Sequence, residues 1–489
     1  MQSRKNSYEN RKPIVRIDRN NLRCLSKRLL ICTIKGRPQI TLSCFKTYDV
    51  RGRVGHDLDE SIAYRIGRAF AQSLNARKIV VGCDVRLSSP ALKAALAEGL
   101  RDAGSDVIDL GLTGTEEIYF ASFHLDVDGG IEVTASHNPA DYNGMKFVGK
   151  SGRPIRIRDE FVHLKELAEG NVFTDAAKRG NLTSQSLLEP YCRHLLGCID
   201  VGSLRPMRIV VDSGNGAAGH VIDALEGLLP QLHFVKVNHV PNGYFPNGVP
   251  NPLLPERRSD TSKEVKRHKA DLGIAWDGDF DRCFLFDNAG EYVSGYYLAG
   301  LLMQAFNAKD PTSRFIIDPR LLWNTRDILQ HVPSRSFTSR TGHTFFKEHM
   351  RDFDAIYGGE SSSHHYFRDF AYCDSGMLPW LLVVEHLGKS GKSLREVIEE
   401  RKALFPCSDE INFKVVSTDA AIAHVLAHYR KIAKVIDFTD GLSLEFDTWR
   451  FNLRGSNTEP LLRLNVESRG DTKLVAEKVD EIAALIGTV

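Results

Sequence analysis

Three aspartates at alternate positions are the sharpest chemical signal in the sequence. Asp277, Asp279 and Asp281 lie in WDGDFDRC, directly after an apolar run typical of a buried strand. Carboxylates this close raise one another's pKa unless a cation lies among them, and hard oxygen ligands suit Mg²⁺. An EF-hand starts with the same spacing but needs Gly at its sixth and Glu at its twelfth position, where this chain has Arg282 and Asn288. A solvated acidic turn is the alternative, but a strand that runs directly into three aspartates favours the metal site.

A second group consists of hydrogen-bond donors in the stretch LRGSNTEPLLR. Its members are Arg454, Ser456, Asn457 and Thr458. An arginine makes forked contacts to phosphate oxygens, and small hydroxyl residues with free backbone N–H groups complete a cradle around an anion. The stretch therefore indicates a phosphate site, although a tight turn between two strands fits the same spacing.

A third polar loop, GGESSSHHYFRDF, follows another apolar run. Glu360 stands directly after two glycines, and the polar residues here are suited to sugar hydroxyls. The tandem His364 and His365 suggest metal ligands, but adjacent side chains rarely point at one ion, which favours a catalytic or packing role.

The neighbours Ser136 and His137 in IEVTASHNPADYNGMK raise the question of a nucleophile and its base. A Ser–His nucleophilic pair is normally assembled from distant parts of a chain, together with a third orienting group. No G-x-S-x-G elbow surrounds Ser136. The hydrolase interpretation is therefore poor.

The glycines of SGNGAAG resemble a dinucleotide-binding turn. Gly214, Gly216 and Gly219 follow the apolar run MRIVVD with G-x-G-x-x-G spacing. An NAD site also needs an acidic residue about twenty positions further on, where LHFVKVNHV offers Lys236 and Asn238. The glycines therefore favour a tight strand-to-helix turn.

The elements that must position these loops alternate between strand and helix. Lys78–Gly82 is typical of a buried strand, and SSPALKAALAEGLRDAG behind it has Ser at the cap, Pro90 in the first turn and leucines at helical spacing. The alternation restarts at MRIVVD and SRFIIDPR, which predicts mainly parallel sheets covered by helices, with ligand sites in their strand-end loops. LSLEFDTWRFNLR and LLRLNVES are typical of antiparallel strands, and Asp471 caps a last helix, so a smaller α+β domain is expected at the C-terminus.

Composition limits the class of partner. The chain has 489 residues, 42% of them hydrophobic, which suits a globular protein of several domains, and its net charge of +2 gives no general indication of nucleic-acid binding. Residues 1–42 hold eleven Lys/Arg against two Asp/Glu, and the remainder holds 53 against 60, a net of −7. The arm's longest apolar run, Leu29–Ile34, is too short for a signal-peptide core or a membrane span. We interpret the arm as a disordered extension rather than a transit peptide.

Nine cysteines without CxxC pairing indicate reduced thiols, as expected of a cytoplasmic protein.

The four loops together, in the order TASHNP, DGDFDR, GESSSHH and RGSNTEP, resemble the phosphoserine, metal, sugar and phosphate loops of the α-D-phosphohexomutase family. The resemblance covers roughly residues 43–489. Longer stretches such as GGIEVTASHNPADYNGMK, HHYFRDFAYCDSGM and WRFNLRGSNTEP are similar to the bacterial phosphomannomutase branch of the family, which feeds GDP-mannose synthesis.

This resemblance implies an α/β fold with three related mixed-sheet α/β domains and a C-terminal α+β domain, heart-shaped with a central cleft. The expected limits are 1–42 for the basic extension, 43–181 for the domain with the phosphoserine loop, 182–290 for the metal loop, 291–405 for the sugar loop and 406–489 for the phosphate loop.

The activity implied is the reversible interconversion of mannose 6-phosphate and mannose 1-phosphate through a phosphoserine enzyme and a hexose 1,6-bisphosphate. A bifunctional phosphomannomutase/phosphoglucomutase is the alternative, and an NAD-dependent oxidoreductase is a distant one. Hexose phosphates are the expected partners, without nucleic acid or membrane, and the expected state is a monomer or homodimer.

The resemblance also assigns roles to single residues. Ser136 would carry the phosphoryl group and complete the Mg²⁺ site with Asp277, Asp279 and Asp281. Arg51, Lys146 and His343 would lie beside it, and Lys146 or His364 would be the general base or acid. The residues expected to bind substrate are Tyr48, Arg282, Arg320, Glu360, Ser362, Arg454, Ser456, Asn457 and Thr458.

The sugar loop departs from the usual family pattern, G-E-M-S-G-H or G-E-M-S-A-H-H. Ser361 and Ser363 replace Met and Gly or Ala, whereas Glu360, Ser362 and His364 are retained. Binding is therefore expected to persist, but reduced backbone freedom at Ser363 puts the sugar preference in question.

Overall fold

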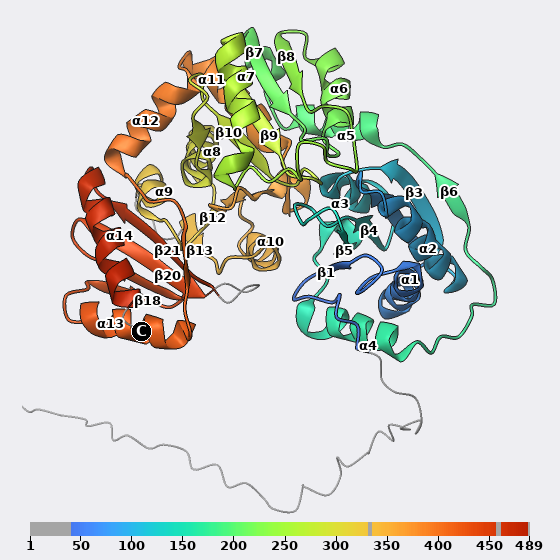
Figure 1. Ribbon diagram of the computed structural model, residues 1–489. Coiled ribbons are helices and arrows are strands. Elements are labelled where there is room, and N and C mark those ends of the chain that lie inside the picture. The colour runs from blue at the N-terminus through green and yellow to red at the C-terminus, as the bar shows by residue number, and fades with distance from the viewer. Residues whose placement is uncertain (1–40, 331–334, 456–460, 488–489) are drawn as a thin grey trace, which may run out of the picture. The chain divides into compact units, whose positions relative to one another are not determined.

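Four β-sheets follow one another along the chain, each built from strands of one stretch of sequence (Figure 1). The computed structural model describes residues 41–330, 335–455 and 461–487. The basic extension therefore lies outside the described residues except for its last two. No helix in the described ranges is both long and apolar enough to cross a bilayer.

The first sheet is mixed, with the strand order β1-β5-β4-β2-β3-β6. β2, β3, β4 and β6 run parallel, β5 pairs antiparallel with β4, and β1 pairs antiparallel with β5 at the edge of the sheet. β2 and β4 are almost fully buried runs, as expected of strands covered on both faces. The strands are β1 (Val50–Arg53), β2 (Lys78–Cys83), β3 (Asp106–Leu112), β4 (Gly129–Val133), β5 (Tyr142–Gly149) and β6 (Leu182–Ser184), and the helices are α1 (Glu60–Leu74), α2 (Ser89–Asp102), α3 (Thr115–His124) and α4 (Val162–Gly170).

The second and third sheets are also mixed, with the orders β11-β10-β9-β7-β8 and β13-β12-β14-β15-β16. The second has β7 (Met207–Asp212), β8 (Leu232–Val237), β9 (Leu272–Trp276), β10 (Cys283–Phe286) and β11 (Tyr292–Val293), with α5 (Leu188–Gly197), α6 (Gly219–Leu228) and α7 (Ser259–His268). The third has β12 (Phe315–Ile317), β13 (Ser336–Thr338), β14 (Tyr357–Gly359), β15 (His365–Phe367) and β16 (Cys373–Asp374), with α8 (Gly295–Lys309), α9 (Trp323–Ile328), α10 (His343–Asp352), α11 (Leu378–Ser390) and α12 (Leu394–Leu404).

All three mixed sheets share one arrangement. In each, three parallel strands are followed by an antiparallel strand that forms a hairpin with the third: β4 with β5, β9 with β10, and β14 with β15. The parallel strands have the same spatial order each time, namely β3-β2-β4, β8-β7-β9 and β13-β12-β14. The expectation of three related α/β units is confirmed at the level of topology.

The fourth sheet is entirely antiparallel, in the order β17-β21-β20-β19-β18. Two helices pack against it, which confirms the α+β expectation. Its elements are β17 (Ile411–Lys414), α13 (Thr418–Tyr429), β18 (Val435–Asp437), β19 (Leu442–Glu445), β20 (Trp449–Gly455), β21 (Leu461–Ser468) and α14 (Thr472–Ile486).

The local signals in the sequence were mostly correct. The Asp471 side chain caps α14 by accepting from the Leu474 N–H. Ser88 is the N-cap of α2 and a proline lies in the first turn as expected, but the serine makes no capping hydrogen bond because its backbone is already helical. The described cysteines are free thiols. The domain limits stay predictions, and β6 pairs with β3 just beyond the limit expected at 181.

A buried ion-pair cluster joins the fourth sheet to the third domain. Glu467 on β21 and Arg450 on β20 are both fully buried and lie 2.8 Å apart. Glu467 also accepts from the backbone N–H groups of Leu322 and Trp323 and from the Tyr296 hydroxyl. Because these donors belong to the third domain, the pair fixes the two inner strands β20 and β21 of the fourth sheet against it.

Replacing Glu467 with Ala should destabilise the protein by about 3–5 kcal/mol, because Arg450 would stay buried without its carboxylate. Thermal unfolding of the full chain should show the loss as a lowered first transition. Glu399→Ala, which removes only an exposed partner of Lys402, is the matched control and should leave the transition unchanged. An unaltered transition in the Glu467 variant would contradict the role assigned to this cluster.

Candidate active site

Ser136 lies in the hairpin link between β4 and β5, in a tightly held backbone conformation. Its φ is +49°, a left-handed value that costs a non-glycine residue energy and needs support from its surroundings. The Ser136 N–H donates to Thr134 Oγ1 at 2.9 Å. The fully buried Arg86 donates to the Ser136 and Asn138 carbonyls at 2.9 and 2.6 Å. These bonds fix the loop so that the Ser136 hydroxyl faces the second domain.

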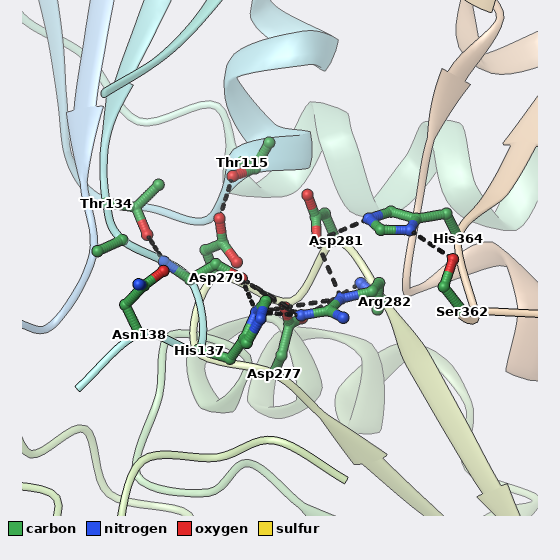
Figure 2. A network of polar contacts seen from close by, with 12 residues as sticks. Thr115, Thr134, His137, Asn138, Asp277, Asp279, Asp281, Arg282, Ser362 and His364 are labelled. Atoms are coloured by element: carbon green, nitrogen blue, oxygen red, sulfur yellow. Dashed lines mark hydrogen bonds and ion pairs between the residues drawn. The ribbon is translucent and has the colours of Figure 1, made fainter. Parts of the chain in front are cut away.

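The three aspartates occupy the equivalent hairpin link between β9 and β10, and they meet Ser136. The Ser136 hydroxyl donates to Asp277 Oδ2 at 2.7 Å. Lys146 on β5 donates to Asp279 and Asp281 at 2.7 and 2.5 Å. Figure 2 shows these carboxylates beside the Ser136 loop, with Thr115 from α3 bonded to Asp279 at 2.6 Å. The predicted convergence of a serine and three aspartates from distant parts of the chain is thus present.

Glycines allow the two loops to approach this closely. A Cβ on Gly278 would lie 2.5 Å from the Ser136 carbonyl oxygen. A Cβ on Gly216 would lie 2.8 Å from the Gly278 carbonyl, which accepts from the Ala217 N–H at 3.1 Å. The glycine stretch is therefore the tight turn expected, and it supports the aspartate loop. At the end of β8, Lys236 pairs with acids on α6 rather than supplying the acid of an NAD site.

The aspartates have the properties of a divalent-cation site. One oxygen from each lies within 4.8 Å of the others, and all three side chains are buried. Asp279 Oδ1 and Asp281 Oδ1 are buried without a hydrogen-bond donor among the described residues. Burial and the two neighbouring carboxylates raise the pKa of Asp277 to about 6 despite Arg282. Unshared carboxylate oxygens at this density fit Mg²⁺.

His137 does not have the environment of a base for Ser136. Its Nδ1 lies 3.0 Å from Ser136 Oγ, but the Arg282 guanidinium donates to the same nitrogen at 2.5 Å. Burial and Arg282 hold the pKa of His137 well below its usual value. Because a guanidinium is always a donor, the Nδ1 lone pair is occupied, and the Ser136 hydroxyl turns to Asp277 instead.

Two further cations lie beside the aspartates and the Ser136 loop. Burial alone would favour a neutral amine at Lys146, but Asp279 and Asp281 outweigh it and raise its pKa, so the side chain is an ammonium donor. Arg51 on β1 donates to the Asn138 side chain at 2.5 Å, next to the Ser136 loop, and pairs with Asp49.

The third domain contributes the link between β14 and β15. His364 Nε2 lies 4.0 Å from Asp281 Oδ1, so this loop reaches the aspartates, and its Nδ1 lies 3.3 Å from Ser362 Oγ (Figure 2). Burial and Arg282 hold the His364 pKa well below its usual value, so the imidazole is neutral. Glu360 accepts from the Gly342 N–H and the Tyr366 hydroxyl. Ser363 has a φ of +66°, so the residue that replaces Gly or Ala is strained.

His343 begins α10, and its ring packs edge-on against Tyr48 of the first domain, with centroids 5.4 Å apart. Burial and Lys347 lower its pKa to about 3, so its imidazole is neutral. The structure brings these two predicted residues together and records no direct bond from His343 to Ser136.

The phosphate-loop arginine lies near an arginine of the third domain. Arg454 on β20 pairs with Glu410 at 3.0 Å, and Arg320 lies 3.5 Å from the same carboxylate. Ser456, Asn457 and Thr458 lie outside the described residues. Arg463, directly opposite Arg454 on β21, also pairs with Glu410, at 3.1 Å.

Sequence reasoning missed Arg86, Thr115, Arg463 and Glu410. A signal existed for Arg463, since it ends the quoted stretch LRGSNTEPLLR. Arg86 carried only the weak signal of following a strand end. Glu410 had none, because its partners are far away in sequence.

Comparison with known proteins agrees with this architecture. Four family models match in order, described as phosphoglucomutase/phosphomannomutase alpha/beta/alpha domain I over residues 43–164, domain II over 189–290, domain III over 294–405, and the C-terminal domain over 410–485. The chain belongs to the phosphoglucomutase/phosphomannomutase family, the α-D-phosphohexomutases.

Individual relatives are similar over nearly their whole length. A phosphomannomutase of Escherichia coli is 57% identical over 452 residues, which cover 91% of this chain and 99% of the relative. A protein of Xanthomonas campestris pv. campestris named "Phosphohexose mutases" is 52% identical over 451 residues, covering 91% and 100%. A crystal structure of a phosphoglucomutase/phosphomannomutase family protein from Burkholderia thailandensis superposes with a TM-score of 0.83 at 30% identity, covering 92% and 98%.

Asp279→Asn should weaken divalent-cation binding by at least ~10-fold, because even loss of an outer-shell partner commonly costs that much. Titration of the full-length protein with Mn²⁺, followed by electron paramagnetic resonance, measures the affinity without relying on turnover. Asp447→Asn, which alters an exposed carboxylate in the fourth domain, should bind Mn²⁺ like the wild type. Equal affinity in the Asp279 variant would refute the metal site.

Proposed function

We propose that this protein is a phosphomannomutase that interconverts mannose 6-phosphate and mannose 1-phosphate through phosphorylated Ser136. The observation that carries the proposal is the 2.7 Å hydrogen bond from the Ser136 hydroxyl to Asp277, at the meeting point of a strained serine loop and three buried aspartates. The names of the relatives support the same activity, and supply of mannose 1-phosphate to GDP-mannose synthesis is part of the proposal.

The chemistry is a phosphoryl exchange between two oxygens. The bond between Ser136 Oγ and phosphorus breaks as the 1- or 6-hydroxyl oxygen of the hexose phosphate bonds to phosphorus. The hydroxyl proton leaves the sugar, and a proton finally returns to Ser136 Oγ. The product is a hexose 1,6-bisphosphate, which reorients and returns its other phosphoryl group to Ser136 by the reverse step. A free hexose 1,6-bisphosphate would also restore the phosphoserine after its loss.

Asp277, Asp279 and Asp281 would hold Mg²⁺ together with a phosphoryl oxygen on Ser136. The bound ion would neutralise charge on the transferring group and on the departing serine oxygen. Phosphoryl transfer otherwise depends on positioning. Arg86 fixes the Ser136 loop, and Lys146, as an ammonium already paired with two carboxylates, is a donor to phosphoryl oxygens.

We assign the proton transfer to His364 rather than to Lys146. The Lys146 ammonium has no lone pair to accept a proton, whereas the His364 imidazole lies at the rim of the aspartate loop with 22% of its side chain exposed. Glu360 and Ser362 flank His364 and would bind sugar hydroxyls, and His343 and Tyr48 would line the same side. Arg320 and Arg454, with Ser456, Asn457 and Thr458, would hold the phosphate that is not reacting.

Ser136→Ala should abolish turnover of mannose 1-phosphate even with glucose 1,6-bisphosphate supplied, because no oxygen remains to carry the phosphoryl group. Mass spectrometry of the wild-type protein should find phosphate on the peptide containing Ser136, and EDTA should stop turnover until Mg²⁺ is restored. Ser151→Ala, at an exposed serine of the same domain, is the matched control. Full activity of the Ser136 variant would rule out the phosphoserine route.

A bifunctional enzyme is the second candidate, favoured by the Xanthomonas relative named for phosphohexoses in general. Mannose and glucose differ at the 2-hydroxyl, whereas Glu360 and Ser362 are expected to contact other hydroxyls. A site that makes no dedicated hydrogen bond to the distinguishing group discriminates weakly.

We therefore expect kcat/KM for mannose 1-phosphate and glucose 1-phosphate to differ by less than ~100-fold, with mannose preferred. Glucosamine 1-phosphate, which carries an amine at the same carbon, serves as the comparison substrate. A preference of ~10⁴ or more would show that an unidentified residue reads the 2-hydroxyl.

A further inference from the structure

Glu410 occupies the centre of the arginine cluster. Its carboxylate lies 3.0 Å from Arg454, 3.1 Å from Arg463 and 3.5 Å from Arg320. Glu410 directly precedes β17, so three neighbouring strands of the fourth sheet supply the carboxylate and two of its partners. Arg320 comes from the third domain, behind β12. One carboxylate therefore links guanidinium groups of two domains.

The cluster has the chemistry of a phosphate site with a carboxylate already in it. Arginine forks bind carboxylates and phosphates by the same geometry. The Arg454 and Arg320 side chains are 7% and 5% exposed, whereas Glu410 is 28% exposed, so solvent reaches the carboxylate more readily than two of its partners. Arg454 Nε is buried without a hydrogen-bond acceptor in the described part of the chain. Donor capacity therefore remains beyond what Glu410 uses.

The other acids around the cluster already have fixed partners. Asp318 pairs with Arg320 at 2.5 Å and also accepts from the Ser361 N–H. Asp440 accepts from the Thr341 hydroxyl at 2.7 Å and lies 3.9 Å from Arg454. Within the described residues the Glu410 side chain pairs only with arginines, so an incoming anion competes with Glu410 first.

We propose that Glu410 is an exchangeable internal ligand of the distal phosphate site: it pairs with Arg320, Arg454 and Arg463 when the site is free, and the substrate's phosphate displaces it. The inference rests on the proposed function, in which this cluster holds the phosphate that is not reacting. Glu410 is thus a positioning residue without another role in the proposed mechanism.

Exchange of this kind matters because the bisphosphate must release one phosphate from the cluster before it can reorient. Without Glu410, Arg454 would keep only the more distant Asp440, 3.9 Å away, as a carboxylate partner in the described chain, and the arginines together would hold a phosphate dianion strongly. When the Glu410 carboxylate pairs with the arginines again, it lowers the free-energy cost of releasing the phosphate. The same pairing weakens phosphate binding by the same amount. Glu410 thus balances capture against release.

The experiment measures binding of inorganic phosphate to the full-length protein by isothermal titration calorimetry. Glu410→Gln keeps the shape of the side chain but removes the competing charge, so the phosphate Kd should fall roughly tenfold, equivalent to ~1.4 kcal/mol. Glu410→Asp, whose shorter side chain reaches the three arginines less well, should give a smaller fall. Glu445→Gln, which loses an ion pair to Arg326 between the same two domains, is the matched control and should bind phosphate like the wild type.

A double variant locates the effect. Adding Arg454→Ala to Glu410→Gln should remove the gain in affinity, because phosphate then lacks its main partner. The proposal would be overturned if the gain in phosphate affinity persisted without Arg454. It would also be overturned if the phosphate Kd of both Glu410 variants were equal to or higher than that of the wild type.

Steady-state kinetics with mannose 1-phosphate distinguish exchange from a purely structural role of Glu410, which would not lower KM and kcat together. Tighter holding and slower release should lower KM and kcat together in Glu410→Gln. A raised KM would overturn the exchange and make Glu410 a fixed support for the arginines. Failure of the proposed function is distinguishable, because the wild type would then not turn over mannose 1-phosphate, whereas the phosphate titrations would still report on Glu410.

Discussion

The burial of three aspartates against one serine is the constraint on which the rest of the site depends. Carboxylates at this density are stable in a dry environment only with positive charge around them. Lys146 bridges Asp279 and Asp281, and Arg282 pairs with Asp277. In the described part of the chain two carboxylate oxygens, Asp279 Oδ1 and Asp281 Oδ1, accept no hydrogen bond and are thus suited to a divalent ion. The surrounding cations are therefore a structural requirement of the buried aspartates.

The repeated topology explains how such distant motifs meet. Ser136, the aspartates and Glu360 each lie in the hairpin link after the third parallel strand of their own sheet, behind β4, β9 and β14. Because the three domains share one strand order, the equivalent link of each domain can face the same point. The fourth domain lacks the arrangement, and its antiparallel sheet offers arginines on neighbouring strands instead. Repetition of one fold thus brings three different sets of polar side chains together.

The features that could be predicted from the sequence were those that depend only on neighbouring residues in the chain. The aspartate loop, the glycine turn at Gly214–Gly219 and the cap at Asp471 are local patterns, and their spacing already indicated their structure. Arg86 and Glu410 could not be predicted in this way, because the partners that give both side chains their roles lie far away in the sequence and meet them only in the folded chain. Ser136 is intermediate. Its loop was predicted as a turn, but its contact with Asp277 spans 141 residues, and only the resemblance to a family suggested that the serine and the aspartates meet.

The two ends of the proposed substrate would be held by different kinds of interaction. At Ser136 the backbone is strained and clamped by Arg86, and the charges are buried, so the reacting group has one position. At the arginine cluster the anion partner is a carboxylate that is 28% exposed, while Glu467 and Arg450 hold the same sheet against the third domain. A mutase needs this asymmetry. The transfer geometry must recur in both halves of the reaction, whereas the distal phosphate must be bound and released in the middle, so rigidity belongs at the first end and exchange at the second.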